Sequence, residues 1–487
     1  MLVKLFTVRV ILGILGVEDY GIYNIVGSVV IIFTFMNSGM TSATQRFLNF
    51  AIGQNDFKQA RNVFSISFII HIIIALLVVI FAETIGLWFF FTWLNIPADR
   101  QSAAFIVYQF SVLTTVICII QVPYLSVIIA HEKMSFFALL SIIEVLLRLG
   151  SVFLLEIIFF DKLIVYAFLF FIITLIIFFL HKIYCNKVFE TARFHFCKDK
   201  KLLKHLAEFS GWTIFGQFTG ASRTHGINIL INIFNGVAVN AAMGLATQIN
   251  SAVFTFVTNF QTAFRPQIIK SYATKNYDYF IKLIFRTSKI SFYMLLFLIM
   301  PLYLNADFVL QIWLKNVPDY TFVFTKIILL HSLIEAIAGP LWMSIQATGD
   351  IKKYQIVISC FAITNLLLTL IFLLLGYSPV WVLIIKIFIS VITLFWRIFF
   401  LRDRINLPVL KFFREVITPI ILITVISGLI NILLINFFFE WVKLIFTCIV
   451  STISIGCLIY FIGINSDEKI LLRNWINRLI KRTENPI

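Results

Sequence analysis

The stretch VFSISFIIHIIIALLVVIFAETIGLWFFFTW, from Val63 to Trp93, holds one charged side chain, Glu83, in 31 positions. About 20 mostly apolar residues are enough for a helix to cross the hydrocarbon core of a bilayer. A strand of a membrane β-barrel would instead be about 10 residues of alternating character. The stretch therefore predicts a transmembrane helix.

The rest of the 487-residue chain has the same character, with 61% hydrophobic and 13% charged residues. Average soluble domains are about 45–50% apolar and about 25% charged, and no soluble fold buries this much apolar surface. The composition excludes a soluble enzyme, a secreted disulfide scaffold and a disordered protein. The six cysteines have no metal-ligand spacing, so we expect neither a zinc site nor any other cofactor.

Stretches of this kind predict an all-α polytopic membrane protein with about fourteen transmembrane helices. They cover residues 2–16, 22–47, 63–93, 104–130, 136–160, 163–184, 209–234, 237–264, 285–314, 322–347, 354–375, 379–401, 416–438 and 441–464. We expect an N-lobe of six helices in residues 1–184, a cytoplasmic linker in 185–208 and a C-lobe of six helices in 209–401. Helices thirteen and fourteen in 402–464 and a basic cytoplasmic tail in 465–487 complete the chain.

Basic residues are distributed unevenly between the two sides of this topology. The net charge is +16, and seven Lys and Arg residues lie between Lys182 and Lys204 alone. The connections on the opposite side hold only Arg100, Lys162, Lys315 and Lys443. Cytoplasmic loops carry the excess of Lys and Arg, so both termini are predicted to be cytoplasmic. The excess charge is then a feature of membrane topology, and we expect no nucleic-acid partner.

Two pairs of segments suggest an internal repeat. SATQRFLNFAIGQND, residues 42–56, ends the second span, and FRPQIIKSYATKNYD, residues 264–278, ends the eighth, in a register that pairs Asp56 with Asp278. PYLSVIIAHEKMSFF from Pro123 resembles PLWMSIQATGDIKKY from Pro340. Repeats six helices apart share one orientation and are related by a pseudo-two-fold axis along the membrane normal. This arrangement is typical of transporters with a substrate site between the halves.

Polar side chains follow one face of three predicted spans. They are Asn24, Ser28, Thr34, Ser38, Thr41 and Gln45 in the second, Thr213, Gln217, Gly220, Thr224 and Asn228 in the seventh, and Asn240, Gly244, Thr247, Ser251, Thr255, Thr258 and Thr262 in the eighth. Polar residues within a bilayer face the bundle interior or a wet cavity. Small polar residues also join membrane helices to one another, so a shared polar cleft and simple helix packing are both open.

Charges inside the predicted spans are costly unless they have a partner or face water. Arg223 has no acidic neighbour on its own helix, so it is the strongest candidate for contacting an anionic ligand, with a bond to Glu335 as the alternative. Arg148 and Glu144 are four residues apart and could neutralise each other. The candidates for coupling to an ion gradient are Glu335, Glu83 and His225.

Arg46 and Arg265 end the second and eighth spans. They are either anchors at the cytoplasmic face or phosphate ligands at the mouth of a cleft. The sequence contains no GxxxxGK[ST] loop, GxSxG elbow or HExxH pair, so we expect a transporter and not an enzyme.

Seven segments, which follow one another along the chain, are the basis of a resemblance to a known family. They are LGVEDYGIYN from Leu15, SATQRFLNFAIGQND from Ser42, IIAHEKMSFFA from Ile128, FSGWTIFGQ from Phe209, VNAAMGLATQ from Val239, RPQIIKSYA from Arg265 and QATGDIKKYQI from Gln346. Over almost the whole chain the sequence resembles the bacterial polysaccharide flippases, which export O-antigen and other lipid-linked oligosaccharides. This family lies in the multidrug, oligosaccharidyl-lipid and polysaccharide exporter superfamily.

The resemblance implies that the chain flips an undecaprenyl-diphosphate-linked oligosaccharide from the inner to the outer leaflet of the bacterial inner membrane. The product would serve polysaccharide, lipopolysaccharide or O-antigen biosynthesis. The resemblance also implies a cationic cleft, with Arg9, Arg46 and Arg265 at the positions of the cleft arginines. The full candidate set for substrate binding is Arg9, Arg46, Arg148, Arg223, Arg265, Asn228 and Gln248. Because such proteins usually begin further upstream, we expect the first helix to be truncated.

Two other functions are open. An ion-coupled multidrug or cation antiporter of the same fold would need acidic residues in its cleft. A membrane-embedded glycan polymerase or acyltransferase would need a positioned acid–base or nucleophile pair. The expected partners are the lipid-linked oligosaccharide, membrane lipids and other membrane proteins of polysaccharide assembly.

Overall fold

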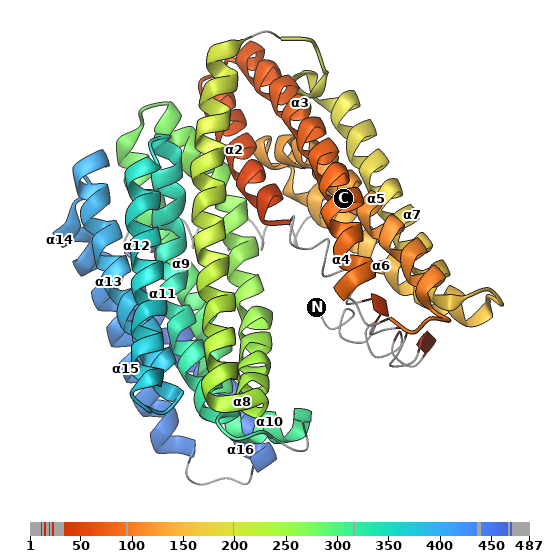
Figure 1. The fold of residues 1–487 in the computed structure, drawn as a ribbon. Coiled ribbons are helices and arrows are strands. Elements are labelled where there is room, and N and C mark those ends of the chain that lie inside the picture. Colours follow the sequence, from red (N-terminus) through yellow and green to blue (C-terminus); the bar gives the residue numbers. More distant parts are fainter. Residues whose placement is uncertain are drawn as a thin grey trace, which may run out of the picture. The chain divides into compact units, whose positions relative to one another are not determined.

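The computed structural model describes residues 11, 14–15, 19, 22–23, 34–93, 96–197, 199–314, 317–435, 440–465 and 468–469. Within these residues the chain forms helices joined by short connections, and it contains no strand (Figure 1). Ten of the described helices are long and apolar enough to cross a membrane. The protein is therefore an all-α polytopic membrane protein, as the sequence predicts. Most of the predicted first helix and the tail beyond residue 469 lie outside the described residues.

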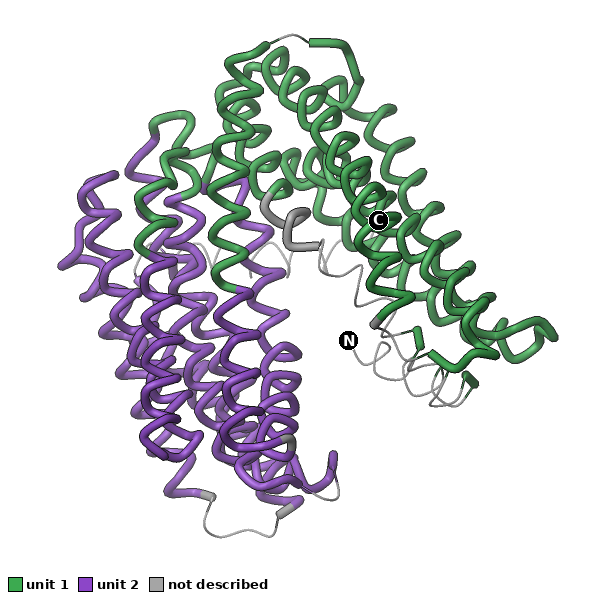
Figure 2. Tube along the Cα trace, viewed as in Figure 1, with its two compact units in different colours: residues 1–220, 269–275, 346–357 green, residues 221–268, 276–345, 358–487 purple. Residues whose placement is uncertain are grey.

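The chain folds as two compact units, which Figure 2 distinguishes by colour. Unit 1 comprises residues 1–220, 269–275 and 346–357. Its helices are α2 (Thr34–Gly53), α3 (Phe57–Phe81), α4 (Leu87–Trp93), α5 (Gln101–Ala130), α6 (Met134–Ile157), α7 (Lys162–Val188) and the first part of α8 (Lys200–Ala273). A π-helical turn (Ala82–Gly86) joins α3 to α4, and a short 3-10 turn (Glu190–Ala192) follows α7. One buried hydrophobic cluster of unit 1 includes Leu48, Phe64, Tyr124 and Cys185.

Unit 2 comprises residues 221–268, 276–345 and 358–487. It contains the second part of α8 and most of α11 and α12. Its elements are α9 (Tyr277–Leu304), α10 (Ala306–Leu314), α11 (Thr321–Thr348), α12 (Lys352–Leu374), α13 (Val380–Ile405), α14 (Val409–Phe412), α15 (Thr418–Ile435) and α16 (Glu440–Leu458), with π-helical turns at Phe413–Ile417 and Ile459–Gly463.

Four helices begin at a side chain that caps them. Asp56 accepts a hydrogen bond from the Gln59 amide at 2.8 Å, and Asp161 accepts one from the Leu163 amide at 3.0 Å. Asp199 and Asn276 cap α8 and α9 in the same way. Such caps satisfy backbone N–H groups that have no partner inside the helix. The short polar residues between apolar stretches therefore determine where these helices begin.

Three predicted spans change in detail. The seventh and eighth form α8, which is interrupted only at Gly236, where φ is 82° and ψ is 177°. Ile231 before this point and Met243 after it share one buried cluster, so the chain folds back at Gly236. The ninth span was predicted at 285–314, but α9 begins at Tyr277 and ends before Asn305, and α10 is separate. The charges of the first turns of α9 hid its true start in the sequence.

Backbone geometry supports the repeat and corrects one register. The turns after α2 and α8 each place a residue at positive φ, Asn55 at 58° and Lys275 at 57°, directly before the capping residue. This pairs Asp56 with Asn276, two residues away from the register that pairs it with Asp278. Glu132 and Gly349 also have positive φ, at 58° and 83°, and agree with the register that pairs Pro123 with Pro340.

Segments from both sequence halves lie in unit 1. The Gln346 amide donates to the Ser42 hydroxyl at 2.8 Å, and the Lys270 ammonium pairs with the Glu132 carboxylate at 2.7 Å. Gly53 lies so close to the backbone of Lys270 that a Cβ atom at Gly53 would not fit. The compact units thus do not follow the two halves of the sequence, and the division into lobes at 185–208 stays a prediction.

Candidate functional site in the membrane-spanning helices

After Gly236, α8 exposes small and polar side chains at helical spacing. Ala241, Gly244, Gln248, Ser251, Thr255 and Thr258 form a stripe of exposed small and polar positions, and Phe256 beside them is the large apolar exception. The opposite face is buried and apolar, with Ala242, Met243, Ala246, Val253 and Val257. Polar side chains at membrane depth need water or a partner. This exposed stripe therefore suits a water-filled space and does not suit lipid.

The hydroxyl groups of the stripe bond back to their own helix. Ser251 donates to the Thr247 carbonyl at 2.9 Å, Thr255 to the Ser251 carbonyl at 2.6 Å, and Thr258 to the Thr255 carbonyl at 3.0 Å. Each hydroxyl has one proton to donate and two lone pairs that can accept. Because each hydroxyl proton is already donated to a carbonyl of the same helix, the side chains of the stripe offer a ligand mainly acceptor oxygens. These would match a ligand that carries many hydroxyl donors.

A charged cluster surrounds Glu335 of α11 in unit 2. One carboxylate oxygen lies 4.0 Å from a terminal nitrogen of Arg397, and the other lies 3.8 Å from Nε2 of His331. The same His331 nitrogen is 2.9 Å from the Ser390 hydroxyl of α13. The Glu335 carboxylate thus joins α11 to α13, and its negative charge is already balanced by Arg397.

Two further cations lie within electrostatic range of this carboxylate. They are Arg223 of α8 and Lys386 of α13, which also interact with each other. Among the described residues of the cluster, three cationic side chains accompany one carboxylate. An uncompensated positive charge at membrane depth is costly unless an anion or water neutralises it. The cluster is therefore suited to receive an anionic group.

The structure adds three residues to the candidate site. Arg397 has no role in the predicted site, but it lies inside α13, within the predicted span 379–401, and pairs with Glu335. Lys386 and Ser390 join it, and neither is in the predicted site. The sequence signal was present, because positions 386, 390 and 397 recur at helical spacing on one face. The expected alternative for Arg223, an interaction with Glu335, is consistent with this geometry.

Arg46 lies in unit 1, towards the end of α2. One terminal nitrogen donates to the Ala347 carbonyl at 3.5 Å, and the guanidinium carbon lies 4.6 Å from the ring centroid of Phe47 and 4.9 Å from that of Phe50. It lines a cavity of about 380 Å³ with His205, Glu208, Trp212, Asp350 and Lys352. The cavity contains both signs of charge, so it has less cationic excess than the cluster around Glu335.

The remaining predicted residues lie in several environments. Arg148 pairs with Glu144 at 2.5 Å and lies 4.0 Å from the ring centroid of Phe170, so it has a local counter-charge. Arg265 and Asn228 are half-buried on α8 in unit 2, and Gln248 is exposed on the polar stripe. Arg9 lies outside the described residues.

The candidates for ion coupling also differ from one another. Glu335 is in the charged cluster, Glu83 is exposed in the π-helical turn after α3 and accepts from Gln109 at 3.3 Å, and His225 is exposed on α8. Among the described residues, no group of three His, Cys, Asp or Glu side chains could hold a metal ion.

Comparisons with known proteins agree with this architecture. The family described as "Polysaccharide biosynthesis protein" matches residues 1–271, more than half of the chain. No curated protein matches the chain. A crystal structure of a MATE mutant gives a TM-score of 0.73 at 14% identity, and the match covers 83% of this chain and 93% of that one.

Two further solved structures share the fold. An outward-facing multidrug resistance MATE transporter of the MOP superfamily gives a TM-score of 0.71 at 15% identity, covering 83% of this chain and 92% of that one. A MOP superfamily transporter from Pyrococcus furiosus, described with "reverse polarity of binding pocket", gives 0.67 at 16% identity with the same coverage. The helices, the repeat and the family match lead to one conclusion: this chain belongs to the polysaccharide biosynthesis protein family and has the fold of the MATE-type transporters.

Proposed function

We propose that the chain transports an anionic, lipid-linked oligosaccharide across the membrane by alternating access. The observation that carries the proposal is the cationic excess around Glu335, where Arg223, Arg397 and Lys386 outnumber one carboxylate. Guanidinium groups bind phosphate oxygens through paired hydrogen bonds and keep their charge when they are desolvated. A diphosphate is a suitable counter-ion for such a cluster.

The polar stripe of α8 supports a glycan as the second part of the ligand. Its hydroxyl oxygens accept hydrogen bonds, and Gln248 adds an exposed amide. Sugars present many hydroxyl donors, while their lipid tail would stay in the bilayer. The ligand that fits both features is an undecaprenyl-diphosphate-linked oligosaccharide. We further propose that it moves outward across a bacterial inner membrane, in concert with other membrane proteins of polysaccharide assembly.

The alternative is an ion-coupled antiporter for drugs or other cations, and Glu335 is the residue that favours it. The fold alone does not decide, because the similar structures include both a multidrug resistance transporter and a MOP superfamily transporter described with reverse polarity of its binding pocket. Around Glu335, however, three cations would repel a cationic substrate. The charge balance therefore favours an anionic ligand.

The test compares ligands of opposite charge on the purified chain in a neutral detergent. The probes are a short isoprenyl diphosphate, the corresponding uncharged isoprenol and a lipophilic phosphonium cation, and the readout is the melting temperature. A ligand that binds the folded state raises the melting temperature, and at a given ligand concentration the rise is larger for tighter binding. We expect the diphosphate to stabilise the protein, and the isoprenol and the phosphonium to have little effect.

Variants assign this effect to the cluster. Arg397→Gln and Lys386→Gln should each weaken the affinity for the diphosphate roughly tenfold or more, since charge-assisted hydrogen bonds contribute about 1.5–3 kcal/mol. Arg402→Gln is the matched control, because Arg402 lies on the same helix but is exposed and pairs with Asp403 at 3.0 Å. Stabilisation by the phosphonium and not by the diphosphate would refute the proposal and support cation export.

A further inference from the structure

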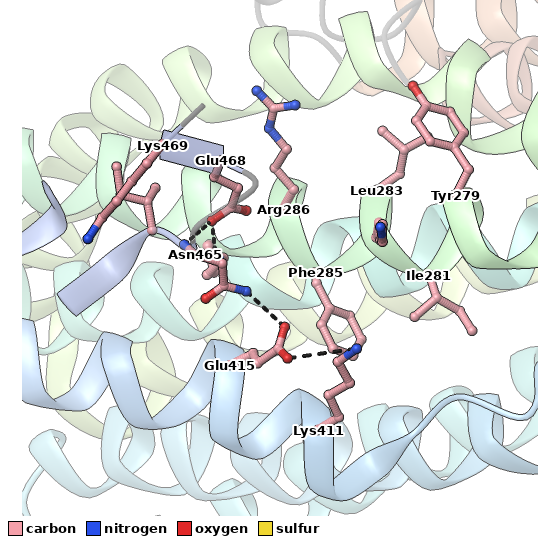
Figure 3. A pocket seen from close by; sticks show the side chains of 13 residues that line it. Tyr279, Ile281, Leu283, Phe285, Arg286, Lys411, Glu415, Asn465, Glu468 and Lys469 are labelled. Atoms are coloured by element: carbon pink, nitrogen blue, oxygen red, sulfur yellow. Dashed lines mark hydrogen bonds and ion pairs between the residues drawn. The ribbon is translucent and has the colours of Figure 1, made fainter. Parts of the chain in front are cut away.

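A second cavity lies in unit 2, away from the residues of the proposed transport site. Its volume is about 670 Å³, and α9, α14 with the following turn, and the segment after α16 line it. Figure 3 shows side chains from these three segments around one space. Ligand sites commonly have volumes of about 300–1,000 Å³, so the cavity can hold a group as large as a lipid headgroup.

The cavity has more positive than negative side chains. The cations that line it are Lys282, Arg286, Lys289, Lys411 and Lys469, and the carboxylates are Glu415 and Glu468. The charge count among the lining residues leaves an excess of three cations. This excess at one opening favours an anionic ligand.

The two carboxylates are engaged inside the cavity wall. Glu468 pairs with the buried Lys289 at 2.7 Å and accepts from the Asn465 amide at 2.9 Å. Glu415 accepts from the Asn465 side chain at 2.9 Å and lies 3.8 Å from Lys411. In Figure 3, no dashed line joins Arg286 to any of the residues drawn. Both carboxylates thus pair with cations of the cavity wall, and Arg286 and Lys469 add positive charge beyond these two pairs.

The position of the cavity indicates the kind of ligand. The candidate spans Tyr277–Leu304 and Val409–Leu434 begin at it, and the span Trp441–Gly463 ends at it, so three spans meet here at one membrane face. Beside it, Leu410 is 87% exposed and Phe461 72% exposed. Such apolar side chains would contact acyl chains, while the basic cavity faces the headgroup layer. A ligand that is anionic at one end and apolar at the other fits both surfaces.

We propose that this cavity binds the phosphate headgroup of an anionic membrane lipid. Basic pockets between membrane helices at the cytoplasmic side are suited to such headgroups. The site is independent of the proposed transport function, because none of its lining residues belongs to the cluster around Glu335.

The experiment titrates the purified full chain in neutral detergent with phosphatidylglycerol, phosphatidylcholine or inorganic phosphate, and follows the melting temperature. We expect phosphatidylglycerol to stabilise the wild-type protein at lower concentration than phosphatidylcholine does. The double variant Arg286→Gln/Lys469→Gln should bind phosphatidylglycerol at least about tenfold more weakly, since each basic side chain near an anionic lipid contributes roughly fivefold. Lys289 is left unchanged because it is buried in an ion pair.

The controls distinguish binding in this cavity from general electrostatic attraction of anionic lipid to basic side chains, and from binding at the proposed transport site. Arg402→Gln removes an exposed cation at the end of α13 and should leave the phosphatidylglycerol affinity unchanged. Arg397→Gln, which tests the transport site, should also leave it unchanged. The proposal is overturned by unchanged affinity in the double variant, or by equal stabilisation with phosphatidylcholine. Equal saturation by inorganic phosphate would assign the cavity to a soluble phosphate and would overturn the lipid assignment.

Discussion

His131 shows how one side chain in a short turn becomes dependent on pH. It lies between α5 and α6, half-buried, with its ring stacked on Phe189 at a centroid distance of 4.3 Å and Nε2 3.1 Å from the Thr191 hydroxyl. Burial, and then the nearby charges of Lys270 and Lys133, lower the pKa of His131 to about 4. Glu132 is adjacent, but its carboxylate pairs with Lys270. The folded protein therefore keeps His131 neutral.

The first prediction follows from the sign of this shift. In the unfolded chain the pKa is about 6.5, so between pH 6.5 and pH 4 the unfolded state binds a proton that the folded state does not. The contribution of neutral His131 to stability is complete above pH 6.5 and is lost as the pH falls towards 4. We expect the melting temperature to fall less steeply from pH 7 to pH 5 in His131→Gln than in the wild type.

The comparison isolates His131, because all other histidines are the same in both proteins. Glutamine does not titrate but can still hydrogen-bond to the Thr191 hydroxyl. The measurement is thermal unfolding in detergent at pH 7, 6 and 5. Parallel pH curves for the two proteins would mean that His131 is not held neutral by its surroundings.

The reversal of α8 depends on one residue at the scale of the helix. Gly236 has φ of 82° and ψ of 177°, a conformation that is essentially restricted to glycine. We expect Gly236→Ala to destabilise the protein by roughly 1–3 kcal/mol, because a Cβ atom strains this backbone. The melting temperature in detergent should fall accordingly.

Gly244 provides the matched control on the same helix. It lies in regular helix on the exposed stripe, and a Cβ atom there would meet no atom within 4 Å. Alanine in place of a helical glycine is favourable by roughly 0.5–1 kcal/mol, so Gly244→Ala should keep or raise the melting temperature. An equal loss in both variants would show that the turn at Gly236 is not the cause.

Hydropathy and capping residues predict most elements, and the exceptions have physical reasons. The predicted spans 104–130 and 322–347 agree closely with α5 and α11, because each apolar stretch is bounded by polar turns. The start of α9 was misplaced because Asp278, Lys282 and Arg286 lower the hydropathy of its first turns, although these turns are helical.

The candidate site was less predictable than the helices. Arg223 could be found from its isolation on its own helix. Arg397 could not be predicted as a residue of the candidate site, because its partner Glu335 lies 62 positions earlier and on another helix. Pairing between helices is a tertiary feature, and a single sequence reports only spacing along one helix. The position of Arg397 near the end of an apolar stretch also matches the ordinary pattern of a membrane anchor.

At the scale of the whole chain, the connections of unit 1 sort into two groups. Arg61 donates to the Arg193 carbonyl at 3.0 Å, and His195 lies 2.9 Å from the Asn62 side chain, so basic connections contact one another. Arg100 instead pairs with Asp19 and, at 2.7 Å, with Asp161, which are in the other set of connections. This agrees with the alternation predicted from the sequence and leaves open which face is cytoplasmic.

The distribution of charge predicts that orientation. Loops rich in Lys and Arg stay in the cytoplasm, so the connections that contain Lys200 and Lys353 should be inside, and those that contain Asp99 and Asp319 should be outside. All four side chains are exposed, so each can be replaced by cysteine in a chain whose six native cysteines have been removed. The measurement is labelling of bacterial cells with a membrane-impermeant maleimide.

We expect Asp99→Cys and Asp319→Cys to be labelled in intact cells, and Lys200→Cys and Lys353→Cys only after the membrane is permeabilised. The orientation has a consequence for transport: with the interior negative, outward movement of an anion is favoured by about 2.3 kcal/mol per charge per 100 mV. The inverted labelling pattern would place the basic connections outside and remove this driving force. A mixed pattern, with one position of a pair on each side, would show that the helix count between those positions is wrong.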